Sequence, residues 1–238
     1  MVPGGPRLLT YPDPKSWSEL GEWWLLELAS DPAYENVVTP MLIDLLRPEA
    51  GKSYLDLGSG EGRVMRKVKA FGAKVHGVEL NSGLAQRSAE VGPTEVGELP
   101  DLSAFDSESF DGVYCVLVLE HLSDSDRLFA EGARVVDRNG VFVLVANHPA
   151  WTAPGSTPIT DSEGEILWRP GAYFGEGTTE EPAGQGRVVF HHRSMSALLR
   201  SAAASGWCLE NIVEAPHPDL EDQSGIPRLL GCRWRREP

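Results

Sequence analysis

The sequence lacks clustered cysteines. Its three cysteines, Cys115, Cys208 and Cys232, are far apart in a chain of 238 residues and form neither a CxxC pair nor a Cys/His spacing typical of zinc sites. The sequence also lacks any uninterrupted apolar run near the roughly 18 residues of a membrane span. Its first residues have neither the basic start nor the apolar run of a secretory signal. These absences predict a reduced, cytoplasmic protein without structural metal and without a membrane partner.

Positive charge is scarce as well. Lys and Arg number 21 against 35 Asp and Glu, which gives a formal net charge of −14. A protein of this sign repels a phosphate backbone, so we expect no nucleic acid partner. The arginines near the end of the chain are predicted to form a solvated tail.

Strand and helix patterns alternate from residue 53 onward. Apolar runs typical of buried strands occupy residues 53–59, 74–80, 93–99, 110–121 and 140–149, and helical patterns occupy 62–72, 82–91 and 126–136. A helix at 194–206 and two strands at 207–215 and 227–236 complete the series. The alternation predicts an α/β fold with a Rossmann-like, mostly parallel sheet of seven strands and helices on both faces.

Two segments stand outside this alternation. Residues 1–48 are predicted to form an arm and two helices, the first capped by Ser16 and the second capped by Thr39 with Pro40 at its first position. Residues 149–190 contain many prolines and glycines without a sustained period, and are too long for an ordinary connection. We expect one domain, 1–238, in which this insert is an acceptor-binding cover that closes together with the amino-terminal helix, rather than a linker or a disordered segment.

The stretch LDLGSGEGR, residues 55–63, places three glycines between a strand and a helix. Such a turn presents bare backbone N–H groups and a positive helix end to a ligand. A P-loop would require Gly-Lys-Ser/Thr at the helix start, which is absent. A dinucleotide site would show GxGxxG rather than GxGxG, so an NAD-dependent oxidoreductase is a weaker alternative.

The same stretch resembles motif I of the class I S-adenosylmethionine-dependent methyltransferases, most closely their small-molecule branch. The resemblance implies S-adenosyl-L-methionine as cofactor and an antiparallel final strand. It places the ribose at Glu79, where two carboxylate oxygens suit a vicinal diol, and the adenine at Glu98 and Leu99, although the family more often has Asp at the position of Glu98. The full set of cofactor residues that it implies is Asp56, Gly58, Ser59, Gly60, Gly62, Glu79, Leu80, Glu98, Leu99 and Val116.

Histidines gather near the predicted carboxyl edge of the sheet. His121 and His148 follow two strands, and His191 and His192 lie at the exit of the insert. One of these four is expected to act as general base, since histidine exchanges protons near neutral pH. No metal ligands are expected.

Aromatic residues are concentrated in the two segments outside the alternation. Tryptophans 17, 23 and 24 lie in the first, and the second holds Trp151, Trp168, Tyr173 and Phe174. They are expected either to line an acceptor pocket or to attach these segments to the sheet.

The predicted activity is methyl transfer to O, N or C of a small, aromatic or amphipathic metabolite, for example in natural-product biosynthesis. A cofactor-binding sensor or partner subunit without catalysis is the alternative from another class. The sequence does not indicate an oligomeric state.

Overall fold

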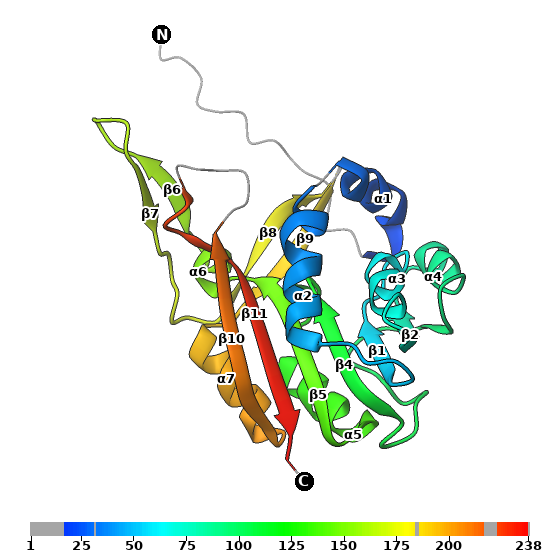
Figure 1. The fold of residues 1–238 in the computed structure, drawn as a ribbon. Helices are drawn as coiled ribbons and strands as arrows, with labels where there is room; N and C mark the ends of the chain where they lie inside the picture. The colour runs from blue at the N-terminus through cyan, green and yellow to red at the C-terminus, as the bar shows by residue number, and fades with distance from the viewer. Residues whose placement is uncertain (1–16, 31, 184–185, 217–222, 238) are drawn as a thin grey trace.

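The computed structural model describes residues 17–30, 32–183, 186–216 and 223–237. Seven strands form one sheet in the order β10-β11-β5-β4-β1-β2-β3 (Figure 1). Their bounds are β1 (Ser53–Leu57), β2 (Lys74–Glu79), β3 (Thr94–Val96), β4 (Phe110–Val116), β5 (Val136–Asn147), β10 (Trp207–Pro216) and β11 (Pro227–Arg236).

The strand directions confirm the predicted fold. Strands β1 to β5 pair in parallel, and β11 runs antiparallel to both β5 and β10. The strand order changes direction between β1 and β4, so their carboxyl ends border the crevice in which open α/β sheets bind ligands.

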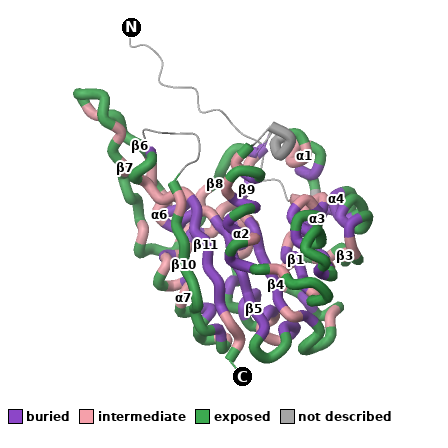
Figure 2. The backbone as a smooth tube through the Cα atoms, viewed as in Figure 1, coloured by how far each residue is buried: buried purple, intermediate pink, exposed green. Residues whose placement is uncertain are grey.

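Helices cover both faces of the sheet. One core joins α2 (Thr39–Leu46) and α3 (Arg63–Lys69) to the sheet, and the other joins α5 (Ser125–Val135) and α7 (Met195–Ala204) to its opposite face. Helix α4 (Ser82–Ser88) packs beside β2 and β3. Figure 2 shows the central strands buried and the edge strand β10 exposed. Among the described residues, no helix has the length and apolar character needed to cross a membrane.

Of the two helices before β1, the first begins later than the sequence predicts, whereas the second, α2, covers the predicted residues without the predicted cap. The predicted cap Ser16 lies outside the described residues, and after a short turn, η1 (Trp17–Glu19), helix α1 spans Gly21–Ser30. The prediction of Thr39 as a cap is wrong. A π-helical turn, η2 (Tyr34–Val38), runs directly into α2, so the Thr39 N–H already bonds the carbonyl of Tyr34.

The insert is ordered into a short helix and two hairpins. Helix α6 (Pro149–Thr152) leads to β6 (Thr157–Thr160) paired with β7 (Ile166–Arg169), and then to β8 (Gly177–Ala183) paired with β9 (Gly186–His192). The first hairpin projects away from the sheet, whereas β8 and β9 lie next to the amino-terminal helices (Figure 1). A small apolar cluster of Leu20, Ala183 and Val188 joins these two segments.

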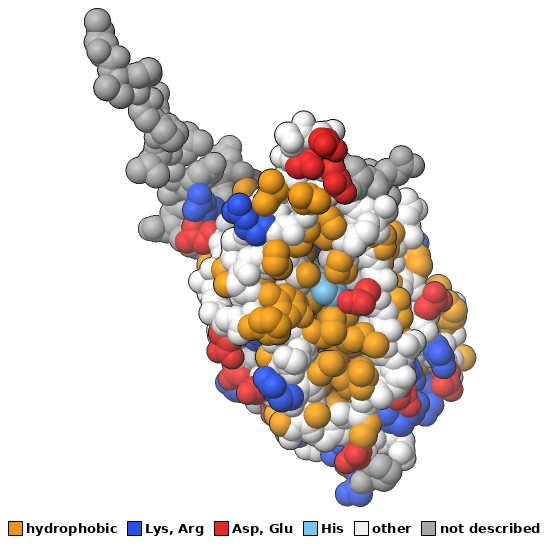
Figure 3. All heavy atoms as spheres, turned by 90° about the vertical axis from the view of Figure 1, so that its left-hand side faces the viewer, with side chains coloured by type: hydrophobic (Ala, Val, Ile, Leu, Met, Phe, Trp, Pro, Cys, Tyr) orange, Lys and Arg blue, Asp and Glu red, His pale blue; other side chains and the backbone are white. Residues whose placement is uncertain are grey.

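One face of the molecule is rich in exposed apolar side chains. Figure 3 shows hydrophobic side chains spread over the side that carries the β6–β7 hairpin and β10. Exposed members of these strands are Ile159, Leu167, Leu209, Ile212 and Val213. None of them lines the pocket at the carboxyl ends of β1 and β4, so this surface and that pocket are separate features.

Candidate active site

A cavity of about 250 Å³ opens above the carboxyl ends of β1, β2 and β4. Its lower half consists of the glycine loop after β1 and the ends of β2 and β3. Its upper half consists of η1, α1, η2 and the turn η3 (Leu119–His121) that follows β4. One cavity therefore joins the predicted cofactor residues to aromatic residues of the amino-terminal helices.

The glycine loop forms a cradle that side chains would fill. Gly58 has a φ of 88°, which favours glycine, and a Cβ there would lie 2.5 Å from Val118 Cγ2. The N–H groups of Gly58 and Ser59 both bond the Val78 carbonyl, at 2.9 and 3.0 Å, which fixes the loop to β2. The space above Gly60 is open until the indole Nε1 of Trp24, 3.7 Å from a Cβ built there.

Glu79 ends β2 as a buried carboxylate, 8% exposed. Its Oε2 accepts from the N–H of Gly60 at 2.9 Å, and its Oε1 accepts from the N–H of Asn81 at 2.8 Å. Burial raises the pKa of Glu79, and these backbone donors oppose the rise. Because each carboxylate oxygen has two acceptor sites, one on each remains for a ligand diol.

Asp56 supplies a second acid at the floor of the cavity. It is 2% exposed, and its Oδ2 has no hydrogen-bond partner among the described residues. Burial raises the pKa of Asp56 well above its usual value. The hydroxyl of Tyr114, the partner of Asp56 on β4, lies beside this carboxylate and opposes the rise in its pKa. A ligand ammonium group would supply a further, charged donor to the buried oxygen. The cradle and this oxygen therefore fit the methionine part of S-adenosylmethionine.

The structure brings nine of the ten predicted cofactor residues to one cavity. They are Asp56, Gly58, Ser59, Gly60, Glu79, Leu80, Glu98, Leu99 and Val116. Gly62 does not line it. It caps α3 with a φ of 83°, and a Cβ there would lie 3.1 Å from the backbone of Ser88. Gly62 permits α3 and α4 to approach closely, which is a packing role.

His121 is the predicted histidine best placed to act as a base. Its ring lies between Trp17 and Phe190, with both centroid distances at 4.8 Å, and it lines the cavity. Its Nδ1 lies 3.3 Å from the carbonyl oxygen of Val189, so Nδ1 carries the proton and Nε2 is an acceptor. Burial lowers the pKa of His121, which keeps the ring neutral at neutral pH.

His148 and His192 use both ring nitrogens in structural hydrogen bonds. His148 Nδ1 accepts from the N–H of Ala150 at 3.0 Å and caps α6, while Nε2 lies 2.7 Å from Glu214. His192 Nε2 donates to the carbonyl of Tyr173 at 2.8 Å, and Nδ1 lies 3.1 Å from Thr152 Oγ1. Because of these bonds, neither histidine has a ring nitrogen left for an acceptor. Neither of them lines the cavity.

His191 lies on the cavity wall, and burial lowers its pKa. Its side chain points the opposite way from that of His192, as the alternation along a strand predicts. The structure thus places two of the four predicted histidines, His121 and His191, at the cavity.

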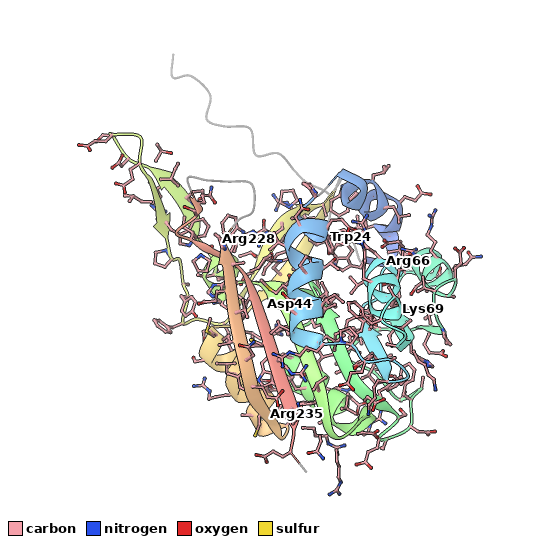
Figure 4. The ribbon with its side chains drawn as sticks, viewed as in Figure 1. Trp24, Asp44, Arg66, Lys69, Arg228 and Arg235 are labelled. Atoms are coloured by element: carbon pink, nitrogen blue, oxygen red, sulfur yellow. The ribbon has the colours of Figure 1, made fainter. Side chains whose placement is uncertain are left out.

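The aromatic residues of the two segments have different roles. Trp17 and Trp24 line the cavity with Tyr34, which sequence analysis missed because its sequence surroundings show no motif. In Figure 4, Trp24 lies near α3, on the side of α1 that faces the glycine loop.

The aromatic residues of the insert that the sequence offered as acceptor contacts lie elsewhere. Trp151 stacks on Trp168 with centroids 4.5 Å apart, and the guanidinium of Arg228 lies 4.5 Å above Trp151. Phe174 is 89% exposed. These residues attach the first hairpin to the sheet or face solvent, and none of them lines the cavity.

Sequence analysis also missed the charged pair at the cavity mouth. Arg63 Nε lies 3.5 Å from Glu61 Oε1, and its guanidinium lies 5.9 Å from the ring centre of Tyr34. Both charged residues belong to the LDLGSGEGR stretch. Two opposite charges near a helix start are common on protein surfaces, so the sequence did not indicate that they line a ligand cavity.

No cluster of three or more potential metal ligands occurs within the part of the chain that the structure describes. The three cysteines are free thiols.

Comparisons with known proteins identify the family. A family profile described as "Methyltransferase domain" matches residues 55–144. The "Ubiquinone biosynthesis O-methyltransferase" of Thiobacillus denitrificans is 32% identical over 145 residues, which are 56% of this chain and 62% of that protein. The same-named protein of Ralstonia nicotianae is 31% identical over 138 residues, 53% of this chain and 57% of that protein. The chain thus spans about three fifths of each relative's length.

A solved structure agrees with this over a longer stretch. The crystal structure of an S-adenosylmethionine-dependent methyltransferase from Mesorhizobium loti superposes with a TM-score of 0.77 at 28% identity. The match covers 88% of this chain and 100% of that one. The glycine cradle, the buried acids, the sheet order and these similarities lead to one conclusion: residues 55–144 form a methyltransferase domain, in a chain with the fold of the class I S-adenosylmethionine-dependent methyltransferases.

Proposed function

We propose that this protein transfers a methyl group from S-adenosyl-L-methionine to a hydroxyl group of a small, neutral, aromatic or amphipathic molecule. The observation that carries the proposal is the single cavity that joins the glycine cradle and Glu79 to His121 and the aromatic wall. A cofactor held by the first set leaves room for an acceptor beside the second.

The residues of the lower half would hold the cofactor. Asp56 Oδ2 would accept from its ammonium group, and the remaining acceptor sites of Glu79 would bind its ribose hydroxyls. Leu80, Glu98, Leu99 and Val116 would border its adenosine part. When bound, the cofactor supplies an electrophilic methyl group on a positively charged sulfur.

His121 would remove the proton of the acceptor. Its Nε2 is the unprotonated nitrogen, because Nδ1 faces the Val189 carbonyl. Trp17 and Phe190 fix the plane of the ring, so Nε2 has one direction of approach. Positioning of this kind, together with removal of the proton, supplies most of what a displacement at a methyl group requires.

The upper half would exclude water from the reacting atoms. Trp17, Trp24 and Tyr34 contact one another edge to face, with centroids 5.4 and 6.0 Å apart. The second hairpin packs against Leu20 and Trp17 through Val188 and Phe190. We therefore assign the covering role of the insert, residues 149–190, to its β8–β9 half, acting with η1 and α1.

The charges at the cavity favour a neutral acceptor. Arg63 is the one Lys or Arg side chain among the described residues of the lining, and it already contacts Glu61 and the Tyr34 ring. A phosphorylated acceptor would find no further cation in this lining, whereas a flat apolar ring would find three aromatic side chains. The names of the relatives, which specify O-methyltransferases, support oxygen as the methylated atom.

Two measurements test the proposal. Calorimetry should detect binding of S-adenosylmethionine and S-adenosylhomocysteine but not of NAD. Incubation with methyl-labelled S-adenosylmethionine and single probes (phenol, catechol, aniline) should transfer label to a hydroxylated probe, with phosphorylated phenol unreactive. Binding without transfer to any probe would favour the sensor alternative, and tight binding of NAD would overturn the cofactor assignment.

A further inference from the structure

A second, much smaller cavity lies behind the wall of the active-site cavity. It measures about 30 Å³, and its polar lining comes from Glu120, Asn147, Thr152, His191 and Arg193. A water molecule requires roughly 10–15 Å³ of such volume and two to four polar partners. The small cavity therefore has the size and lining to hold an ordered water. His191 lines both cavities and forms part of the wall between them.

Glu120 presents an unpartnered carboxylate oxygen in this region. The residue is 5% exposed, and its Oε2 has no hydrogen-bond partner among the described residues. Its Oε1 accepts from the side-chain amide of Asn147. Leaving a buried carboxylate oxygen without a donor is costly, so a water in the adjacent cavity is the partner that the geometry requires.

The orientation of Asn147 explains why only one oxygen of Glu120 is satisfied. Arg228 donates to Asn147 Oδ1, and a guanidinium can only donate, so the amide nitrogen faces Glu120. Figure 4 shows Arg228 near the start of β11, and the next residue, Leu229, pairs with Asn147 of β5. Asn147 therefore holds Oε1 and leaves Oε2 for the cavity.

Arg193 fixes the wall instead of neutralising Glu120 directly. Its guanidinium donates to the carbonyl oxygens of Leu119 and His191, each at 3.4 Å, and to that of Leu122. These bonds tie the turn that carries Glu120 and His121 to the segment that carries His191. The charged and titratable groups around Glu120 are thus His121 on its own turn, His191 within β9, Arg193 directly after that strand, and Arg228 behind Asn147.

His191 is available to connect the two cavities. Its ring makes no hydrogen bond within the part of the chain that the structure describes, in contrast to His148 and His192. It also lies close enough to His121 for its charge to affect the pKa of that ring. A neutral imidazole can accept a proton on one nitrogen and release one from the other.

We propose that His191 and Glu120, joined by one water in the small cavity, form a proton exit for the reaction. The inference rests on the proposed methyl transfer to a hydroxyl group. As the methyl group bonds to the acceptor oxygen, the O–H bond breaks, its electron pair stays on oxygen and the proton binds His121 Nε2. The electron pair of the broken S–C bond stays on sulfur.

The proton then leaves His121 for the neighbouring His191. His191 releases a proton from its other nitrogen to the water, which passes one to Glu120 Oε2, so one proton moves and no electron does. His121 is neutral again before the product departs, and Glu120 holds the proton.

The first test is structural and needs no acceptor. A crystal of the protein with S-adenosylhomocysteine, at a resolution that shows ordered water, should contain one water within hydrogen-bond distance of both Glu120 Oε2 and His191. A cavity without that water would overturn the proposal, whatever the enzyme assays show.

The second test is kinetic, with the phenolic probe that the wild-type protein methylates. His191→Gln and Glu120→Gln should each lower kcat by about tenfold, a modest effect for a step beyond the base itself. KM and the affinity for S-adenosylhomocysteine should not change. The double variant should be no slower than the slower single variant, since both act on one route. Imidazole added to His191→Gly should restore kcat.

The control is Glu214→Gln, which removes a carboxylate that binds a histidine outside both cavities. It should leave kcat unchanged. If Glu120→Gln does not fold, His191→Gly and its rescue by imidazole decide the question alone. Normal kcat in the His191 variants, or additive losses in the double variant, would overturn the proton exit. Absence of transfer by the wild-type protein to every probe would instead refute the proposed function.

Discussion

Replacement of Glu79 by Gln should weaken cofactor binding far more than the removal of one charge from an exposed carboxylate would. In the structure, both carboxylate oxygens accept from backbone N–H groups, Oε2 from Gly60 and Oε1 from Asn81. A glutamine has one acceptor oxygen and one NH₂ group. Its NH₂ must therefore face one of these N–H groups, donor against donor, whichever way the amide is turned.

The size of the effect follows from counting these bonds. One buried N–H loses its acceptor, which costs about 1–3 kcal/mol of stability in the loop. One of the two ribose contacts also loses a charged acceptor, worth about 1.5–3 kcal/mol. At 1.4 kcal/mol for each factor of ten, the Kd for S-adenosylhomocysteine should rise about 10- to 150-fold. Glu79→Ala removes both acceptors, so its effect should be larger.

Calorimetry at neutral pH measures the Kd, and thermal unfolding without ligand measures the loss of stability separately. The matched control is Glu95→Gln, which changes an exposed acid on the adjacent strand β3 that does not line the cavity. It should leave both quantities unchanged. A lower unfolding temperature with an unchanged Kd in both Glu79 variants would refute the ribose assignment and leave Glu79 as a support of the glycine loop.

Three further predictions concern the base, the acids and the insert. His121→Gln should lower kcat by about 10² to 10⁴ with little change in cofactor affinity, whereas His148→Gln should affect stability and not kcat; similar rates for the two variants would contradict the choice of base. Because burial lowers the pKa of His121, the acid limb of the kcat profile should lie below 6.5, and a limb above that value would point to another group. Burial raises the pKa of Asp56 and of Glu79, so both carboxylates lose their charge at a higher pH than free acids do. The affinity for S-adenosylmethionine, measured by calorimetry, should therefore fall on acidification before pH 3.8 is approached. Constant affinity down to that pH would refute their roles. Replacing residues 158–168 by a short turn should leave cofactor binding and turnover intact, whereas a Val188→Asp change in the second hairpin should lower kcat by loosening the cover; loss of turnover on removal of the first hairpin would show that it too covers the acceptor.

The cofactor half of the site could be predicted from the sequence because it is local. The glycines that follow β1 and the acid that ends β2 lie at fixed distances along the chain from strands with strong apolar patterns. Parallel strands bring their carboxyl ends to one edge of the sheet, so neighbouring loops meet there. The antiparallel final strand was implied by the family resemblance, and the observed antiparallel pairing of β11 with β5 confirms it.

The acceptor half could not be predicted in the same way, because distant segments decide it. Nothing near His148 in the sequence indicates that Glu214 takes its Nε2, and nothing near His192 indicates the Tyr173 carbonyl. The cap of α2 was predicted wrongly for a related reason. Thr39 and Pro40 are typical of a helix start, but the preceding turn at Tyr34–Val38 is already helical and packs against the core.

The setting of His121 ties the chemistry to the closing of the molecule. Its ring is held by Trp17 from the amino-terminal segment and by Phe190 and the Val189 carbonyl from the insert, so three stretches of chain far apart in sequence must meet before Nε2 is aimed. A separation of η1 from the β8–β9 hairpin, such as ligand exchange would require in the proposed reaction, would remove these three neighbours from the imidazole together. In the proposed reaction the base is therefore oriented only when these segments are in contact. The acceptor would then be deprotonated only when η1 and the β8–β9 hairpin cover the cavity. A cofactor bound before these segments meet would face no oriented base that could activate water to attack its methyl group.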